Sequence, residues 1–473
     1  MRLRSLAEVC AAGEQVWFQP ALDRLRALAS APDPRLREFL SAEAAVYITR
    51  APGRLDVMGG IADYSGATVL ELPLESATWA LLQRQATPRC ELATLREGCW
   101  HFFSIELSTL LRGELSTPEA LGSWLREHET GDWAAYVVGV VQLCLQRMGC
   151  DAAGGFRLLL DSTLPEGKGV ASSAALEVAS MTAVLAGCGR ELPPLELAAS
   201  CQWVENHVVG APCGIMDQIT SACGRRNRLL RLRCQPASIE GYLEVPPGYR
   251  FYGIDSGIRH AVSGADYGTV RTAAFMGYRM IVEAVDLGGY LCNLLPGVFA
   301  ARFERSLPEE ISGAEFLARY AGIPDTATQV ELERSYPVRQ ATAHPIYEQE
   351  RGERFAPLLA ELPERPEAAD ELGRLMYASH RSYGACGLGS EGTDRLVALV
   401  ALAEPAAGLF GAKITGGGSG GTVAVFGTVE SEARVRDIAA RYARETGRRS
   451  EVFSESGPGA AETGVLVIEP GSP

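Results

Sequence analysis

The stretch that most constrains how this chain folds is residues 164–176, which read LPEGKGVASSAAL. A strand-like run, Gly155–Asp161, precedes it, and an apolar helical run from Ala174 to Leu185 follows. Two glycines, a lysine and two serines therefore fall at the start of a helix, where unpaired N–H groups and the helix dipole attract anions. The stretch predicts a strand–loop–helix unit with a phosphate site. The alternative is an ordinary strand-to-helix turn with a serine cap.

Length and charge limit the class of protein. A chain of 473 residues can form two large domains. Its net charge of −14 argues against nucleic acid or an anionic membrane as a partner, because both need a basic surface. An anionic ligand therefore needs a local positive potential, which the glycine loop can supply.

The cysteines and the apolar runs suggest a compartment. The 12 cysteines include no C-x-x-C pair, which is typical of reduced thiols. No apolar run reaches the length of a membrane span, and Glu8 and Glu14 interrupt any signal-peptide core. We expect a cytoplasmic protein that binds small molecules, has no nucleic-acid or membrane partner, and is a monomer or weak homo-oligomer.

Composition shifts along the chain predict its division. Residues 1–44 read as a helical extension, residues 45–235 as one domain, and residues 236–473 as a second domain with an insertion at about 286–350. The boundary is placed at Gln235–Tyr249, which holds three prolines and two glycines. The strand, helix and strand signals add up to a layered α+β sandwich.

Three further segments concentrate glycine and charge. Residues 51–66, APGRLDVMGGIADYSG, follow a strand signal and predict a ligand loop, or else a bulged hairpin with solvated charges. Residues 213–218, CGIMDQ, carry a buried-looking Asp217, and Glu205 precedes it; each alone is more often a cap or a surface charge. Residues 416–421, GGGSGG, join two predicted strands and indicate a close backbone approach.

Together these four segments, taken in their order along the chain, resemble the signature motifs of the GHMP small-molecule kinases, in particular the galactokinase branch. The resemblance runs from about Ala45 to the C-terminus and leaves out most of the insertion. It implies a ribosomal-S5-domain-2-like N-terminal domain, a ferredoxin-like C-terminal domain and an active site in the cleft between them. It also implies ATP and Mg²⁺ as cofactors.

The same resemblance implies roles for individual residues. Asp217 would deprotonate the anomeric hydroxyl of a sugar, Arg54 would offset charge on the γ-phosphate, and Ser173 with Glu205 would hold Mg²⁺. The implied ATP-binding residues are Pro165, Gly167, Lys168, Gly169, Val170, Ala171, Ser172, Ser173, Ala174 and Trp133. The implied sugar-binding residues are Arg54, Gly60, Ile61, Asp63, Gly214, Asp217 and Tyr267, and the glycine-rich motif contributes Gly416, Gly417, Gly418 and Gly420.

One departure from the family pattern bears on the sugar. Galactokinases carry Glu-His near the C6 hydroxymethyl group, and this chain has Gly60-Ile61. A pentose with the same ring stereochemistry, L-arabinose, has no group there. The chain also resembles the L-arabinokinase group at Gly59–Tyr64, Val204–His207 and Ala343–Tyr347.

We therefore expect ATP-dependent phosphorylation of L-arabinose at its anomeric oxygen. Two alternatives stay open. One is a galactokinase or other C1 sugar kinase, acting on galactose or glucuronate. The other is a non-catalytic, galactokinase-like sugar sensor.

Overall fold

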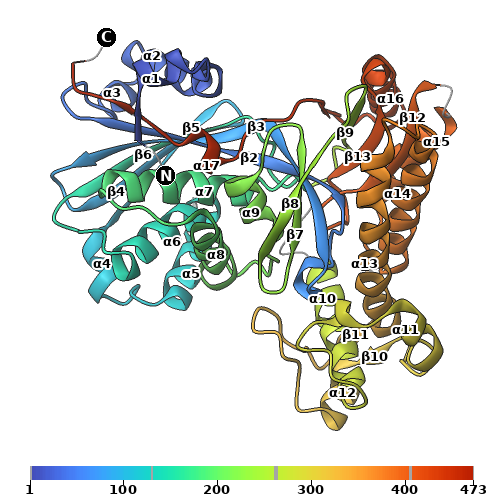
Figure 1. Cartoon of the computed structure of the whole chain (residues 1–473). Coiled ribbons are helices and arrows are strands. Elements are labelled where there is room, and N and C mark those ends of the chain that lie inside the picture. Colours follow the sequence, from blue (N-terminus) through green and yellow to red (C-terminus); the bar gives the residue numbers. More distant parts are fainter. Residues whose placement is uncertain (1–2, 129–130, 260–264, 404–406, 472–473) are drawn as a thin grey trace.

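A computed structural model describes residues 3–128, 131–259, 265–403 and 407–471. Two β-sheets lie side by side in it, each covered by helices, and a smaller helical lobe projects from one end (Figure 1). The mixed α+β architecture agrees with the prediction.

The larger sheet has nine strands in the order β1-β15-β2-β3-β6-β4-β5, and the β7–β8 hairpin pairs with one end of β3. Their bounds are β1 Leu3–Ser5, β2 Val46–Met58, β3 Thr68–Gln85, β4 Arg89–Arg96, β5 Cys99–Glu106, β6 Gly155–Ser162, β7 Arg228–Arg233, β8 Ser238–Glu244 and β15 Val465–Ile468. The short helices α1 Leu6–Ala11, α2 Gln19–Ala29 and α3 Pro34–Arg37 lie over one face.

The other face of this sheet is covered by a helical layer around α7. The layer contains α4 Leu107–Arg112, α5 Pro118–Glu127, α6 Gly131–Arg147, α7 Ser172–Gly187, α8 Pro194–Val204 and α9 Met216–Cys223, with α17 Ala460–Thr463 beside them. Helix α7 is apolar on nearly every side, and it is buried from Ala174 to Ala186 except for Leu176. Strand β6 and helix α7 confirm the predicted strand–loop–helix unit.

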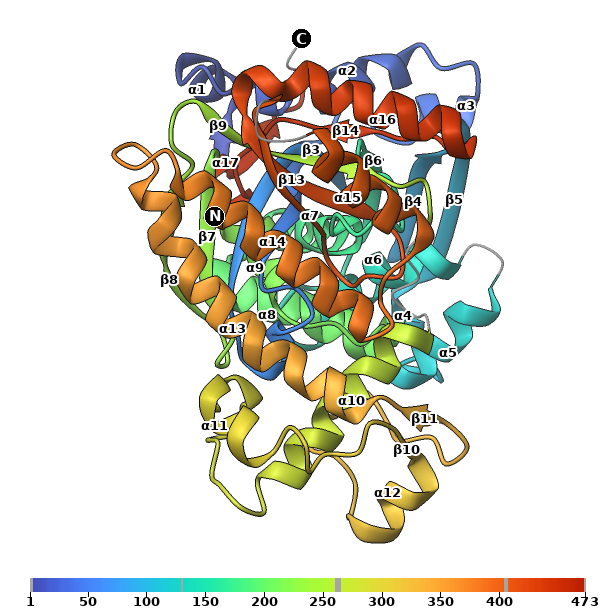
Figure 2. The same ribbon diagram turned by 90° about the vertical axis from the view of Figure 1, so that its right-hand side faces the viewer.

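The second sheet has four strands in the order β12-β13-β9-β14. These are β9 Tyr249–Asp255, β12 Leu409–Ile414, β13 Thr422–Thr428 and β14 Val452–Phe453. Helices α14 Ala368–Ala385, α15 Glu391–Ala403 and α16 Glu432–Thr446 pack on it (Figure 2). Helix α16 buries one face, which consists of Val435, Ile438, Ala439 and Tyr442, and Gly447 follows its last residue.

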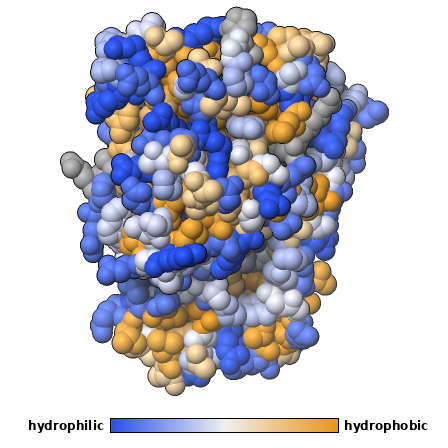
Figure 3. All heavy atoms as spheres, turned by 90° about the vertical axis from the view of Figure 1, so that its left-hand side faces the viewer, coloured by the Kyte–Doolittle hydropathy of each residue, from blue (hydrophilic) through white to orange (hydrophobic). Residues whose placement is uncertain are grey.

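The projecting lobe contains the insertion. Helices α11 Pro296–Arg302 and α12 Gly313–Arg319 and the ribbon β10 Ile311–Ser312 with β11 Ser335–Tyr336 form it, on a core shared with α10 Ala265–Ile281 and α13 Val338–Glu361. Hydrophobic residues gather on its surface at the lower end of the molecule (Figure 3). Among the described residues, none of the helices has both the length and the apolar character that crossing a membrane requires.

The connectivity differs from the predicted division at residues 235 and 236. Strand β8 lies beyond that point but still belongs to the large sheet, because it pairs antiparallel with β7 across the short turn at residues 234–237. Strand β15 also returns to the large sheet, between β1 and β2. We therefore place the change of sheet after Glu244 and assign residues 465–468 to the first sheet. The extension at residues 1–44 is not wholly helical, since it begins with β1.

Candidate active site

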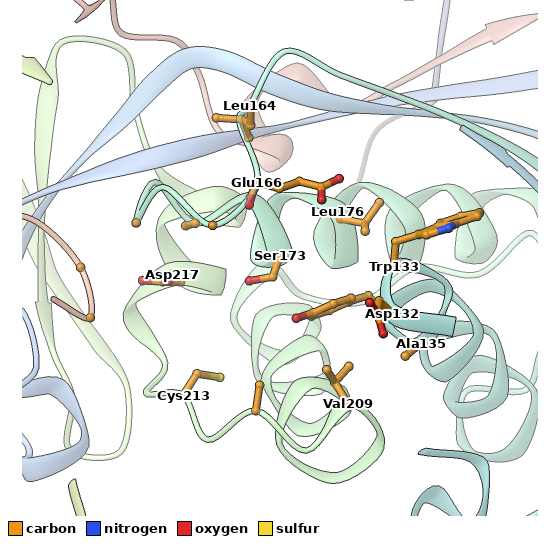
Figure 4. A pocket seen from close by; sticks show the side chains of 18 of the residues that line it. Asp132, Trp133, Ala135, Leu164, Glu166, Ser173, Leu176, Val209, Cys213 and Asp217 are labelled. Atoms are coloured by element: carbon orange, nitrogen blue, oxygen red, sulfur yellow. The ribbon is translucent and has the colours of Figure 1, made fainter. Parts of the chain in front are cut away.

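A cavity of about 560 Å³ lies where the two sheets meet, and all four motif segments reach it. The predicted residues that line it are Arg54, Ile61, Asp63, Trp133, Gly167, Gly169, Ala171, Ser172, Ser173, Gly214, Asp217, Tyr267, Gly416 and Gly417. Ser173 stands at the start of α7, between Asp217 on one side and Trp133 on the other (Figure 4).

Eight predicted residues lie outside the lining: Gly60, Pro165, Lys168, Val170, Ala174, Glu205, Gly418 and Gly420. Lys168 differs most from its expected role. Its Nζ lies 3.2 Å from Asp255 Oδ2 on β9, so the side chain links the loop before α7 to the second sheet and does not line the cavity. Val170 and Ala174 point into the core.

Residues 51–58 of the segment 51–66 belong to strand β2, and residues 59–67 form the turn before β3. The pairing of β2 with β3 shifts register between Pro52 and Arg54 and again between Asp56 and Met58. The predicted ligand loop is therefore a bulged hairpin, the alternative reading, but its charges are buried. Bulges re-aim side chains, which is how a strand residue such as Arg54 reaches the cavity.

The loop before α7 leaves backbone donors facing the cavity. Ala171 is the N-cap in a left-handed conformation (φ 59°), and within the described residues no side chain caps the helix there. The alternative reading, a turn with a serine cap, is wrong, because Ser172 and Ser173 are the first two residues of the helix. Uncapped N–H groups at a helix start form an anion site.

Ser173 and Glu205 meet behind this helix start. Glu205 is 2% exposed, accepts a hydrogen bond from Gln218 Nε2 at 2.6 Å and is hydrogen-bonded by the Ser173 hydroxyl. It begins a π-helical turn, η3 Glu205–Val209, a distortion frequent at functional sites. Burial and the nearby Asp217 raise the pKa of Glu205 to about 7, although its hydrogen bonds oppose this shift.

Arg54 and Asp217 form the charged centre of the cavity. Arg54 Nη2 lies 2.8 Å from Asp217 Oδ1, and its Nη1 donates to the Gly169 carbonyl at 2.6 Å. The guanidinium is thus held between the loop at residues 164–176 and the segment at residues 213–218. Burial raises the pKa of Asp217, and Arg54 opposes that rise. A carboxylate with a raised pKa is the stronger base.

Behind Arg54 lies a buried charge cluster that the sequence did not single out. Lys413 Nζ lies 2.8 Å from Asp56 Oδ2, both side chains are fully buried, and the Tyr383 hydroxyl donates to Asp56 at 3.4 Å. Glu71 lies 3.3 Å from Arg54 Nε, and burial followed by Asp56 raises the pKa of Glu71 well above its usual value. The cluster thus places two cations, Arg54 and Lys413, among the carboxyl groups of Asp56, Glu71 and Asp217.

Asp63 and Tyr267 form another wall of the cavity with Gly214. Asp63 is 5% exposed and accepts from the Tyr64 amide at 2.8 Å. A Cβ on Gly214 would lie 1.6 Å from Asp63 Oδ2, so only glycine allows this approach. Ile61 closes the same wall with an apolar side chain.

Asp63 makes the stability of the unliganded protein depend on pH. Burial and then Asp217 raise its pKa to about 6, while the Tyr64 and Met216 amides and Arg271 oppose this. A carboxyl with a raised folded-state pKa stabilises below its unfolded pKa, and this stabilisation is lost as pH rises through the folded value.

We expect the free energy of unfolding of Asp63→Asn, relative to the wild type, to rise by about 2–3 kcal/mol between pH 4 and pH 7. Urea denaturation of both proteins at several pH values measures this difference. A difference independent of pH would mean that Asp63 titrates normally.

Comparisons with known proteins agree with the geometry. The GHMP kinases N terminal domain matches residues 135–225, and the GHMP kinases C terminal domain matches residues 357–448. The L-arabinokinase of Arabidopsis thaliana is 40% identical over 90% of this chain, but the chain spans only 47% of that protein. The galactokinase of Chloroflexus aurantiacus is 31% identical, over 85% of this chain and 89% of its own.

Solved structures show the same fold. Lactococcus lactis galactokinase, crystallised with galactose, superposes with a TM-score of 0.69 at 21% identity, covering 88% of this chain and 94% of its own. Methanococcus jannaschii mevalonate kinase gives a TM-score of 0.53 at 13% identity, with 86% and 97% covered. The family domains and the galactokinase relatives together show that this chain belongs to the GHMP kinase family, on its galactokinase branch.

Proposed function

We propose that this protein is an ATP-dependent sugar-1-kinase that converts L-arabinose to L-arabinose 1-phosphate. The observation that carries this is the Arg54–Asp217 pair, 2.8 Å apart, facing a cavity between a helix start and an apolar Ile61 wall. The similarity to an L-arabinokinase supports the choice of sugar. Twelve free cysteines fit a cytoplasmic setting.

Asp217 is the base in this mechanism. Its carboxylate takes the proton of the anomeric hydroxyl as that oxygen bonds to the γ-phosphorus of ATP, and the bond to the bridging oxygen of ADP breaks. Arg54 stays charged and offsets the negative charge that spreads over the transferring group. Positioning and electrostatic stabilisation supply most of the catalysis in such transfers.

The cavity fits the triphosphate and Mg²⁺. The uncapped start of α7 and the backbone of Gly167 and Gly169 offer N–H donors to phosphate oxygens. Ser173 and Glu205 give Mg²⁺ the oxygen ligands it prefers, and two protein ligands leave positions for phosphates and water. When bound, the ion neutralises charge on the phosphates. At the far end, the indole N–H of Trp133 is buried without a partner among the described residues and suits an adenine acceptor.

A coupled assay with ATP tests the sugar. We expect the highest kcat/KM with L-arabinose, lower values with galactose, and no turnover of glucuronate or galacturonate. Turnover of galactose equal to or above that of arabinose would instead make the protein a galactokinase. Sugar binding without ADP release would make it a sensor.

Ile61 is the expected point of discrimination. A glutamate at position 60 is excluded, because a Cβ there would lie 2.0 Å from Asp56 Oδ2 and the Tyr383 hydroxyl. We expect Ile61→His alone to raise the galactose-to-arabinose ratio of kcat/KM by up to about 10²-fold, since it replaces an apolar contact by a hydrogen-bonding group. Ile61→Val keeps the apolar wall and is the control; its ratio should match the wild type.

A further inference from the structure

The turn that carries Ile61 has a conformation that its sequence does not favour. Ile61 has φ 52°, in the left-handed region, which a β-branched residue rarely adopts. Such a backbone conformation is unfavourable and persists only where the surrounding structure enforces it. Ile61 is nevertheless 1% exposed and lines the cavity. Contacts from outside the turn must therefore stabilise the left-handed backbone of Ile61.

Helix α13 stabilises the turn through two buried side chains that lie one helical turn apart. His344 Nε2 lies 3.1 Å from the Gly60 carbonyl oxygen, and Glu348 Oε1 accepts from the Gly59 amide at 3.2 Å. Their spacing puts both on one face of the helix. These two hydrogen bonds fix the backbone of Gly59 and Gly60, the two residues directly before Ile61.

Both side chains are themselves fixed. A carbonyl only accepts, so His344 Nε2 carries the proton and Nδ1 accepts from Ser382 Oγ at 2.8 Å. Burial lowers the pKa of His344 to about 4, so it is neutral near pH 7. Glu348 also accepts from Ser379 Oγ and Arg351 Nε, at 2.7 and 2.6 Å. Burial alone would raise the pKa of Glu348, but the charge of the neighbouring Arg351 guanidinium outweighs burial and the pKa falls to about 2.

The opposite side of the turn is closed as well. Gly60 packs against Asp56 and Tyr383 so tightly that a Cβ would overlap both. The Tyr383 ring meets the His344 ring edge-on, with centroids 5.1 Å apart. The turn is therefore enclosed between α13 and the buried Asp56–Lys413 pair.

We propose that His344 and Glu348 are positioning residues that set sugar selectivity by holding Ile61 against the sugar ring, where it occupies the space of a C6 group. Neither side chain lines the cavity, so they act through the turn and not on the reacting atoms. This role rests on the proposed sugar kinase function. It also gives a purpose to the segment Ala343–Tyr347, which the catalytic groups leave unexplained.

Three variants on α13 separate positioning from general stability. His344→Leu removes the donor to Gly60, whereas His344→Gln keeps an N–H donor on a side chain of similar reach. Thr342→Val is the matched control: Thr342 is equally buried on the same helix, but its hydroxyl bonds only to the helix carbonyl of Val338. Steady-state kinetics with arabinose, galactose and ATP are measured for each, with hydrogen exchange of the 58–67 segment.

We expect His344→Leu to raise the galactose-to-arabinose ratio of kcat/KM at least fivefold, through the KM of the sugars, with the KM of ATP unchanged. Exchange in the 58–67 segment should quicken in His344→Leu and not in Thr342→Val. His344→Gln should restore most of the selectivity. An unchanged ratio in His344→Leu, or the same change in Thr342→Val, would overturn the positioning role.

The assay of the wild-type protein distinguishes a failure of the positioning role from a failure of the proposed function. If the wild-type protein prefers galactose, the choice of arabinose fails, and the ratio in the variants still reports whether the turn sets selectivity. If no sugar is turned over, hydrogen exchange and sugar affinity measured by calorimetry decide the same question. Unchanged exchange and affinity in His344→Leu would then reject it.

Discussion

Replacing Asp217 by asparagine is expected to lower kcat by about 10²–10⁴-fold, the usual contribution of a general base. Asparagine cannot accept the anomeric proton, and Arg54 loses the carboxylate 2.8 Å away. The affinity for ATP should change little, because the uncapped helix start that suits the phosphates is formed by other residues. Single-turnover kinetics and ATP titration measure the two quantities separately.

Two controls sharpen this expectation. Asp217→Glu keeps a carboxylate but moves it, so it should retain more activity than Asp217→Asn. The Tm of each variant shows whether the fold survives. An asparagine variant that kept most of the wild-type rate would remove Asp217 from the proton transfer.

The second large effect, on stability, is expected from substitution of Lys413, whose side chain is fully buried. Lys413→Met should lower the free energy of unfolding by about 3–5 kcal/mol, because it leaves the Asp56 carboxylate buried without its cation. The same carboxylate accepts from the Gly416 amide at 3.2 Å, so the glycine-rich link should loosen as well. Urea denaturation measures the first effect, and the KM values of both substrates measure the second.

The double variant Lys413→Met with Asp56→Asn should recover more than half of that loss, because no unpaired charge remains. Lys168→Met is the matched control. This variant also breaks an ammonium–carboxylate pair, the one between the loop before α7 and β9, but Lys168 keeps 14% of its side chain exposed, so the loss of stability should be smaller. Equal losses in the two lysine variants would show that burial does not set the cost.

The strand–loop–helix unit and the glycine-rich link could be predicted because their local signals and their final structures agree. Residues 155–187 carry a strand pattern, a glycine loop and an apolar helix in the order that the fold uses. Asp217 could be singled out because a charge beside glycine in apolar surroundings is costly unless it is paired or used, whereas the role of Arg54 rested on the family resemblance.

The groups that hold the site in place could not be predicted, because their meaning depends on contacts across long sequence distances. Asp56 and Lys413 read as ordinary strand charges until the two sheets are brought together. Lys168 shows the reverse error: its place between two glycines suggests phosphate, but Asp255 on another sheet competes for it. Gly60 could not be interpreted from the sequence either, because the side chains that enclose it, Asp56 and Tyr383, come from β2 and α14.

Strand β15 joins the large sheet between β1 and β2, with Val465 opposite Thr49 and Leu3 opposite Val465 on the other side. During synthesis, β2 is made long before the strand that covers its edge. Until then its backbone donors and acceptors stay open to wrong partners, and pairing this distant in sequence is slow to form. A ribosome-bound chain should thus acquire its helical layer early and finish this sheet last.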